Sequence, residues 1–323
     1  MKAILCKQYG PPDQLQVTEV EKPSPADNEV LIKVYAASVN PMDVFLVQGF
    51  PLIRLIPGLR SPKDPRLGTD FAGRVEAVGS RVTEFKPGDD VFGACRGAFA
   101  EYVCIAEDKI ARKPVNISFE QAGAITVAAI SALQGLRDHG KIQPGQKVLI
   151  DGASGGVGTF AVQIAKALGA EVTAVCSTSK LETARSIGAD RVIDYTREDF
   201  TRAGQQYDLI LAANAHHSIF DYRRALTPRG TFVLVGGAMP LIFQSLLLGP
   251  LLSRLGKIQH HFFIAKIDQG DLIVLKDLIE AGKVVPVIDR CYPLSELPSA
   301  FHYLKEKHAR GKIVITIGHA EPN

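Results

Sequence analysis

The glycine-rich segment Asp151–Gly158 (DGASGGVG) has the residue types and the spacing of a phosphate-binding loop. Glycines let a backbone turn tightly and approach a pyrophosphate closely. A helix that begins in such a segment also points its first N–H groups and the positive end of its dipole at the anion. The expected contacts are Ser154, Gly155, Gly156 and Val157. The spacing is G-x-x-G-G-x-G rather than the strict G-x-G-x-x-G, so a glycine-rich turn without a ligand is the alternative.

A second polar segment follows about 20 residues later, where dinucleotide-binding proteins distinguish NAD from NADP. This chain has Ser177, Thr178 and Lys180 there, and no carboxylate from Val175 to Lys180. Hydroxyl and ammonium groups can hold a 2′-phosphate, whereas an acidic side chain would bind the 2′-hydroxyl of NAD. The segment therefore favours NADP(H). If Ser177 only caps the next helix and Lys180 is solvated, the preference stays open.

The cysteines and histidines do not form a metal-binding pattern. The five cysteines lie at positions 6, 95, 104, 176 and 291, without a C-x-x-C pair. The histidine pairs 216–217 and 260–261 have no matching acidic or thiol motif. Structural zinc sites use four closely spaced ligands. The sequence thus predicts a thiol-reduced protein without a structural zinc or a disulfide framework.

Strands and helices alternate from about residue 120 onward, and this pattern supplies a scaffold for both polar segments. The expected helices are 119–136, 156–168, 180–187 and 218–226, and the expected strands are 147–151, 171–176, 191–194, 207–212 and 231–235. Such alternation is typical of a parallel sheet covered on both faces. The glycine-rich segment follows the first strand and opens the helix 156–168, as a phosphate loop requires.

The remaining parts of the chain have a different texture. The first 120 residues are rich in Pro, Gly and short β-type runs, with expected strands at 30–35, 73–78, 90–92 and 98–105. In the tail we expect helices at 271–281 and 294–305 and strands at 284–288 and 312–317. The 323 residues correspond to about two domains.

Composition excludes several classes of protein. Apolar residues make up 46% of the chain and charged residues 22%, which excludes a disordered chain. With 37 basic and 34 acidic residues there is no basic excess for a nucleic-acid surface. The apolar segment Leu241–Leu252 is shorter than the ~20 residues of a membrane span and contains Pro250, so we expect a buried or interface helix. The apolar part of Met1–Tyr9 is too short for a signal-peptide core, which favours the cytoplasm.

The chain resembles the medium-chain dehydrogenase/reductase superfamily and, within it, the zinc-free quinone oxidoreductase-like branch. The resemblance covers nearly the whole chain and depends on the order and spacing of the blocks 36–43 (AASVNPMD), 67–79 (LGTDFAGRVEAVG), 85–93 (FKPGDDVFG), 97–103 (GAFAEYV), 152–170 (GASGGVGTFAVQIAKALGA), 187–195 (IGADRVIDY) and 311–315 (GKIVI). It implies an α/β protein with a GroES-like, β-rich catalytic domain and a Rossmann cofactor domain with a doubly wound parallel sheet. The implied division is 1–120 for the catalytic domain, 121–262 for the inserted NADP-binding domain and 263–323 for the segment that returns to the first.

The resemblance also implies site residues. Asn40 lies in the VNxxD motif, which in relatives is near the nicotinamide ribose and the substrate; tying down the turn before Pro41 is its alternative role. Ser131 matches a threonine near the cofactor carboxamide, with an ordinary helix-interior serine as the alternative. Tyr195 matches a contact to the adenosine or the 2′-phosphate, and Lys307 or, alternatively, Arg310 is a candidate for added charge there.

The same resemblance bears on zinc. Zinc-dependent relatives have a cysteine ligand where this chain has Asn40, and His-Glu where it has Thr69-Asp70. Without these ligands a catalytic zinc is not expected, and alcohol oxidation loses its Lewis acid. Several relatives have a tyrosine two residues after the position of Asp43, but this chain has Phe45, so no proton donor is assigned.

The expected function is an NADPH-dependent, zinc-independent reductase that transfers hydride to quinones or α,β-unsaturated carbonyls, with a homodimer as the family expectation. The alternatives are a nucleotide-binding redox sensor or binding protein with little turnover, and, disfavoured, a zinc-dependent alcohol dehydrogenase. Two segments are candidates for contact with a lipophilic substrate: 50–60 as a lid, and 239–263 as a pocket wall or else as ordinary core.

Overall fold

A computed structural model describes residues 1–49, 58–255, 258–306 and 309–318. The chain forms two compact units. Unit 1 comprises Met1–Val127, Ile267–Glu280 and Ile288–Asn323, and unit 2 comprises Ala128–Lys266 and Ala281–Val287.

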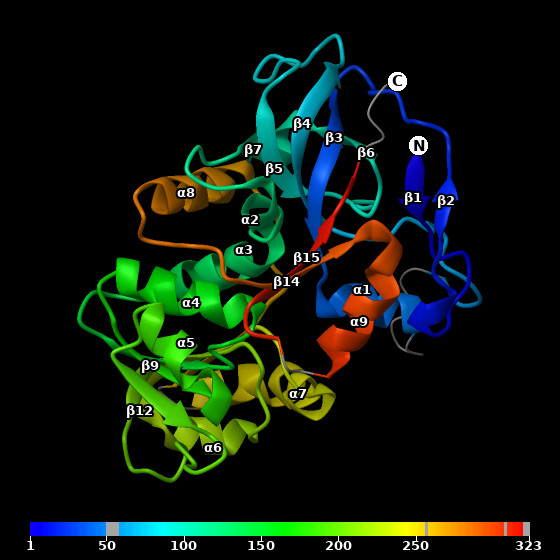
Figure 1. The fold of residues 1–323 in the computed structure, drawn as a ribbon. Helices are drawn as coiled ribbons and strands as arrows, with labels where there is room; N and C mark the ends of the chain where they lie inside the picture. The colour runs from blue at the N-terminus through cyan, green and yellow to red at the C-terminus, as the bar shows by residue number, and fades with distance from the viewer. Residues whose placement is uncertain (50–57, 256–257, 307–308, 319–323) are drawn as a thin grey trace. The chain divides into compact units, whose positions relative to one another are not determined.

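Unit 1 is built around a seven-stranded sheet in the order β14-β15-β3-β4-β5-β7, with β6 paired to β3 off this path (Figure 1). Its strands are β3 (Glu29–Ser38), β4 (Asp70–Val78), β5 (Asp90–Ala94), β6 (Tyr102–Ala106), β7 (Ile110–Arg112), β14 (Ile288–Pro293) and β15 (Lys312–Thr316), with a separate pair of β1 (Lys2–Ile4) and β2 (Val17–Glu19). Its helices are α1 (Pro41–Gln48), α2 (Phe119–Gly123), α8 (Gln269–Glu280) and α9 (Leu297–Lys305). The last strand, β15, pairs antiparallel with β3, so the C-terminal tail completes the N-terminal sheet.

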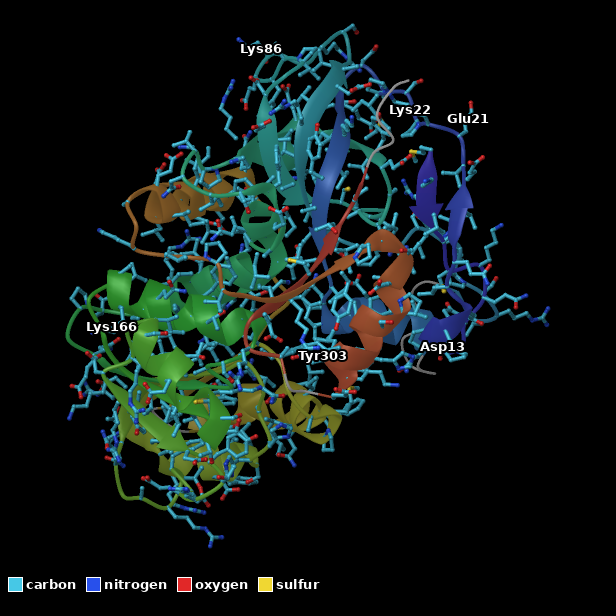
Figure 2. All side chains as sticks on the ribbon, in the orientation of Figure 1. Asp13, Glu21, Lys22, Lys86, Lys166 and Tyr303 are labelled. Carbon is cyan, nitrogen blue, oxygen red and sulfur yellow. The ribbon has the colours of Figure 1, made fainter. Side chains whose placement is uncertain are left out.

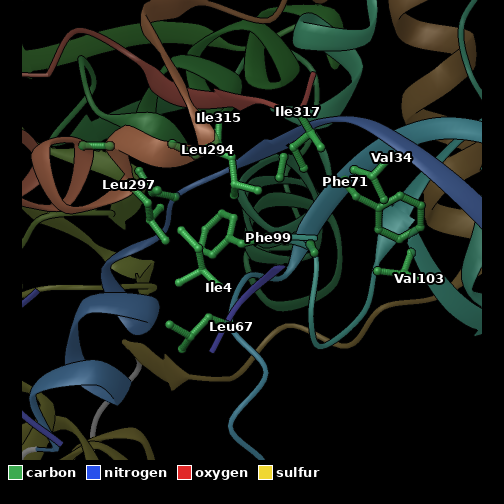
Figure 3. Close-up of a cluster of buried hydrophobic side chains, with 14 of the residues drawn as sticks. Ile4, Val34, Leu67, Phe71, Phe99, Val103, Leu294, Leu297, Ile315 and Ile317 are labelled. Atoms are coloured by element: carbon green, nitrogen blue, oxygen red, sulfur yellow. The ribbon is translucent and has the colours of Figure 1, made fainter. Parts of the chain in front are cut away.

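An apolar core joins the sheet of unit 1 to the chain termini. Ile4 from β1, Phe99, Leu297 from α9 and Ile315 from β15 are fully buried together (Figure 3). Each such side chain contributes ~1.5–3 kcal/mol by leaving water. Segments that are far apart in sequence therefore pack into one core in unit 1.

Unit 2 contains a six-stranded, all-parallel sheet in the order β10-β9-β8-β11-β12-β13. Its strands are β8 (Lys147–Asp151), β9 (Glu171–Cys176), β10 (Arg191–Asp194), β11 (Tyr207–Ala212), β12 (Leu226–Leu234) and β13 (Gln259–Phe262). Its helices are α4 (Gly156–Ala167), α5 (Leu181–Ser186), α6 (Ile219–Arg224) and α7 (Met239–Leu255), preceded by α3 (Thr126–Gln134) and a π-helical turn, Gly135–His139. This strand order is that of a Rossmann fold.

Sequence and structure agree most closely in unit 2. The predicted strands 147–151, 171–176, 191–194 and 207–212 are confirmed with the same bounds. In β8 the three central residues are all fully buried, as expected for a parallel strand covered on both faces. Charged residues cover the surface, such as Lys166 of α4, whose ammonium lies 2.8 Å from the Asp190 carboxylate (Figure 2).

Two predicted elements are wrong. The helix expected at 119–136 is divided into α2 and α3, since α2 ends at Gly123 and a new helix begins at Thr126. A strand is expected at 284–288, but residues 284–287 have no regular structure and strand β14 begins only at Ile288. There the Gln163 side chain takes the place of a neighbouring strand: it accepts from Val285 N at 2.8 Å and donates to Val285 O at 3.0 Å. Pro286 also lacks an N–H for a ladder.

The apolar segment Leu241–Leu252 forms most of α7, which buries one face and exposes another. Leu241 is buried, whereas Phe243, Leu246 and Leu247 are exposed. In the part of the chain that the structure describes, no helix is both long and apolar enough to span a membrane.

Candidate active site

The glycine-rich segment forms the turn from β8 to α4. Gly152 has φ +80°, and a Cβ added there would lie 2.7 Å from Cβ of Asn214. A Cβ added to Gly158 would lie 2.1 Å from the carbonyl oxygen of Gly152, far inside van der Waals contact. Glycine is therefore required at both positions, because the first turn of α4 packs directly against the loop.

The predicted phosphate contacts gather at the N-terminus of α4. Ser154 is buried in the loop, Gly155 is the N-cap residue, and Gly156 and Val157 begin the helix. Gly155 donates its own N–H to Gly152 O at 3.1 Å and has no side chain to cap the helix. A helix start leaves N–H groups without intrahelical partners, so this turn can receive an anion.

Asp151, directly before the loop, was not predicted as a site residue. Its carboxylate is buried and accepts a hydrogen bond from the equally buried Tyr222 hydroxyl. Burial raises the pKa of Asp151 to about 6. Only its place at the end of an apolar strand could have drawn attention to it in the sequence.

The predicted 2′-phosphate residues lie where β9 and β10 end side by side. The parallel register pairs Cys176 with Asp194, so Thr178 and Thr196, each two residues beyond, become neighbours. Thr178 donates its hydroxyl proton to Asp194 Oδ2 at 2.5 Å, and Thr196 donates to Oδ1 at 2.7 Å. The Thr178 hydrogen bond is the first cause that holds the pKa of Asp194 below its usual range.

Asp194 therefore changes what the ends of β9 and β10 offer to a 2′-phosphate. The sequence segment from Val175 to Lys180 contains no carboxylate, but the fold brings one to Thr178 from the neighbouring strand. Ser177 precedes a 3-10 turn, Thr178–Lys180, and Tyr195 is 59% exposed. Lys307 lies outside the described residues.

In unit 1, Asn40 belongs to a buried polar cluster. It is 7% exposed, Asp70 is fully buried and Lys312 is 3% exposed. Asp70 Oδ2 accepts from Ser38 Oγ at 2.8 Å, Asn40 Nδ2 at 3.1 Å and Lys312 Nζ at 3.1 Å. The Lys312 ammonium also donates to Asn40 Oδ1 at 2.8 Å. The other Asp70 oxygen accepts the backbone N–H of Val127 at 2.8 Å.

Asp43 lies in the first turn of α1, next to this cluster. Its Oδ2 accepts the backbone N–H of Asn40 at 2.8 Å, so it holds the turn that begins the helix. Burial raises the pKa of Asp43 to about 7, and the negative charge of Asp70 acts in the same direction. Phe45 is partly exposed on the same helix. Ser131 is a buried residue of α3 in unit 2.

The side chains at the positions compared with zinc ligands do not fit a zinc ion. Zinc needs lone pairs from sulfur, nitrogen or oxygen ligands. Here the Lys312 ammonium, which is itself a cation, is bonded to both Asn40 Oδ1 and Asp70 Oδ2. Among the residues described, no group of three or more His, Cys, Asp or Glu side chains could hold a metal ion.

Two family models match the chain. The alcohol dehydrogenase GroES-like domain matches residues 26–115, and the zinc-binding dehydrogenase model matches residues 187–315. The mouse (Mus musculus) protein "NAD(P)H oxidoreductase RTN4IP1, mitochondrial" is 35% identical over 98% of this chain and 89% of its own length. The chain belongs to the medium-chain dehydrogenase/reductase superfamily.

Further relatives place the chain in the quinone oxidoreductase-like branch of the superfamily. The Arabidopsis thaliana protein "NADPH-dependent alkenal/one oxidoreductase, chloroplastic" is 33% identical over 98% of this chain and 79% of its own length. The solved structure of the quinone oxidoreductase from Coxiella burnetii superposes with a TM-score of 0.86 at 30% identity, covering 98% of this chain and 99% of that one. The predicted fold class is confirmed, and the superfamily is one of oxidoreductases.

Proposed function

We propose that this medium-chain dehydrogenase/reductase is an NADPH-dependent, zinc-independent reductase of quinones or α,β-unsaturated carbonyls. The observation that carries the proposal is the Lys312 ammonium, which is bonded to two of the side chains compared with zinc ligands. A site without a Lewis acid suits acceptors that are already electron-poor. The printed names of the relatives, an NADPH-dependent alkenal/one oxidoreductase and a quinone oxidoreductase, support the same substrate classes.

In this proposal unit 2 is the cofactor domain and unit 1 the catalytic domain. The N-terminus of α4, with Ser154, Gly155, Gly156 and Val157, holds the pyrophosphate of NADP(H). Glycine at position 158 keeps the helix start close enough to the loop for this contact. The bound dinucleotide supplies the hydride, and the chain supplies position and hydrogen bonds.

We assign the 2′-phosphate to the corner formed by Ser177, Lys180 and Tyr195. A phosphate accepts hydrogen bonds, so it needs donors. Thr178 is a weaker donor than its sequence position suggests, because its proton is given to Asp194. The Asp194 charge also opposes a second anion. We therefore expect a preference for NADPH of moderate size, with NADH also accepted.

The proposed chemistry is hydride addition to a conjugated acceptor. A hydride would leave the reduced nicotinamide with the electron pair of its C–H bond and would form a C–H bond on an enone or reduce a quinone; the dinucleotide would become NADP⁺, and the negative charge would move to the conjugated oxygen. A proton from solvent then completes the reduced product. A donor near that oxygen stabilises the developing charge.

Asn40 is the proposed donor of unit 1. Its Nδ2 has two N–H groups, and Asp70 accepts one of them. The second is assigned to the substrate oxygen or to a ribose hydroxyl of the cofactor. Ser131 is assigned to the cofactor carboxamide. The homodimer and the cytoplasmic location stay predictions, and the relatives named above carry mitochondrial and chloroplastic names.

The test is an acceptor panel with NADPH and NADH side by side. Quinones and enones are offered with NADPH or NADH, simple alcohols are offered with NADP⁺ or NAD⁺, and oxidation or reduction of the nicotinamide is followed. We expect turnover of quinones or enones with NADPH and none of alcohols. Tight NADPH binding without turnover of any acceptor would instead indicate a nucleotide-binding sensor. Alcohol oxidation that depends on added zinc would contradict the proposal.

A further inference from the structure

We propose that Lys312 is a positioning residue, whose ammonium fixes the side-chain amide of Asn40 in one orientation. The consequence for turnover rests on the proposed function, whereas the orientation itself does not. Lys312 has been used so far only as the cation that takes the place of zinc, and no positioning role has been assigned to it.

Sheet register brings the three side chains together. The sheet order places β3 between β15 and β4 (Figure 1). Ser38, the last residue of β3, pairs with Asp70 on one side and with Val314 on the other. The pairing continues beyond β3, since Val39 N donates to Ile313 O at 3.1 Å. The starts of β4 and β15 therefore flank the chain where it reaches Asn40.

The chemistry of the two neighbours leaves the amide one orientation. An ammonium can only donate hydrogen bonds, and a carboxylate can only accept them. The amide of Asn40 must therefore turn Oδ1 to Lys312 and Nδ2 to Asp70, as the distances of 2.8 and 3.1 Å record. With both ends held, the second N–H of Nδ2 points in a fixed direction.

Stability alone does not account for a lysine at this place. A buried ion pair is often no more stabilising than a well-packed apolar pair, because both charges must leave water. Asp70 already receives hydrogen bonds from Ser38 Oγ, Asn40 Nδ2 and Val127 N. Besides a counter-charge for Asp70, the ammonium adds a donor-only partner for Asn40 Oδ1, which a carboxylate or an apolar side chain cannot provide.

Removing the lysine should release the amide. In Lys312→Met, Oδ1 of Asn40 loses the donor that Lys312 provides, while Asp70 keeps its other donors. The amide can then rotate, and the second N–H no longer has a single direction. Preorganised donors lose much of their effect on a transition state when they must reorganise.

The first test is a double-mutant cycle on kcat with the best acceptor of the panel. We expect about a 10- to 100-fold loss for Asn40→Ala, and a similar loss for Lys312→Met. The double variant should be no slower than Asn40→Ala alone, because Lys312 acts through Asn40. Ile313→Ala is the matched control, since it removes a buried side chain next to Lys312 on the same strand. Its loss should multiply with that of Asn40→Ala, and multiplication for Lys312→Met would overturn the proposal.

The second test needs no turnover. The chain has five asparagines, so selective ¹⁵N-asparagine labelling gives five side-chain amide signals in the whole protein. The signal missing from Asn40→Ala identifies Asn40. We expect Lys312→Met to shift this signal and to speed its exchange with solvent, and Ile313→Ala to leave it in place. An unchanged signal would refute the positioning role.

The two readouts separate the two proposals. A wild-type protein that reduces no acceptor refutes the proposed function, while the asparagine signal still decides the role of Lys312. Where Lys312→Met does not fold, Lys312→Gln replaces it in both tests, because it removes the charge and keeps a polar side chain. The Gln amide can present either an N–H or an oxygen to Asn40, so it no longer imposes one orientation, and we expect a shift and a non-additive loss of the same kind as for Met but smaller.

Discussion

Replacing Asp43 by asparagine should remove a pH-dependent penalty on the stability of unit 1. Asp43 is buried, with the backbone N–H of Asn40 on Oδ2 at 2.8 Å. Burial raises the pKa of its carboxyl from 3.8 to about 7, and the charge of Asp70 adds to the effect. The folded chain thus holds this proton more tightly than the unfolded chain does.

The sign and the size of the effect follow by linkage. The stability from this group is fully present below about pH 4 and is lost as pH rises through about 7. A rise in pKa of about three units corresponds to roughly 4 kcal/mol, an upper figure for the cost of ionised Asp43 above neutral pH. In Asp43→Asn the side chain stays neutral and its oxygen can still accept the Asn40 N–H. We expect the variant to be more stable than wild type by about 1–4 kcal/mol near pH 8, to keep less than half of this advantage near pH 5, and to lose it only below about pH 4.

The assay is urea unfolding between about pH 5 and pH 8, where the group titrates. The chain has no tryptophan, so far-ultraviolet circular dichroism follows unfolding, and hydrogen exchange of residues 41–48 reports on α1 itself. The difference in unfolding free energy between variant and wild type removes the pH dependence that other groups, such as Asp151, contribute to both proteins. Asp64→Asn is the control. The hydrogen bond from Arg66 holds the pKa of Asp64 below its usual range, so Asp64 does not titrate between pH 5 and pH 8. A constant difference between Asp43→Asn and wild type across the range would refute the reasoning.

Four further outcomes are expected. Lys180→Ala should weaken NADPH binding about tenfold more than NADH binding in calorimetry, and equal losses would count against a 2′-phosphate contact. Asp194→Asn should act in the opposite direction and raise the NADPH preference a fewfold, because it removes a charge next to Thr178; a fall would contradict the repulsion. Gly158→Ala should abolish cofactor binding, since its Cβ would meet Gly152 O at 2.1 Å, whereas Gly318→Ala, which has open space, should bind normally. Dialysis against a chelator should leave acceptor reduction unchanged, and a loss restored by zinc would contradict the zinc-independent reading.

The cofactor unit was the more predictable half of the fold. Its central strands β8, β9 and β11 are mostly buried, so each is a short apolar run bounded by turn residues, and these three and the edge strand β10 have the predicted bounds. The phosphate loop could be located for the same reason, because its glycines stand between an apolar strand and an amphipathic helix. The wrong strand falls where a side chain replaces regular pairing, as Gln163 does for Val285.

The candidate site was harder to predict because its charges arrive across strands. Asp194 follows Thr178 by 16 residues, and only the parallel register of β9 and β10 places its carboxylate on that hydroxyl. Lys312 is 242 residues from Asp70, and no local pattern pairs them. A sequence segment shows which polar side chains it contains. It does not show which of their donors and acceptors already bond to residues of a neighbouring strand, as Thr178 does to Asp194.

Asn40, Thr69 and Asp70 lie at the positions where zinc-dependent relatives have metal ligands. In the sequence alone, Asn40 replaces the cysteine ligand of zinc-dependent relatives and Thr69-Asp70 replaces their His-Glu pair. In the fold Asp70 is a buried carboxylate that would be costly alone, and the chain neutralises it with an ammonium from its last strand. Asp70 and Lys312 therefore form a buried pair of opposite charges, and each depends on the other. Asp70→Asn alone should then leave the Lys312 ammonium buried without its counter-charge, so this single change should destabilise unit 1 more than the combined change Asp70→Asn with Lys312→Met.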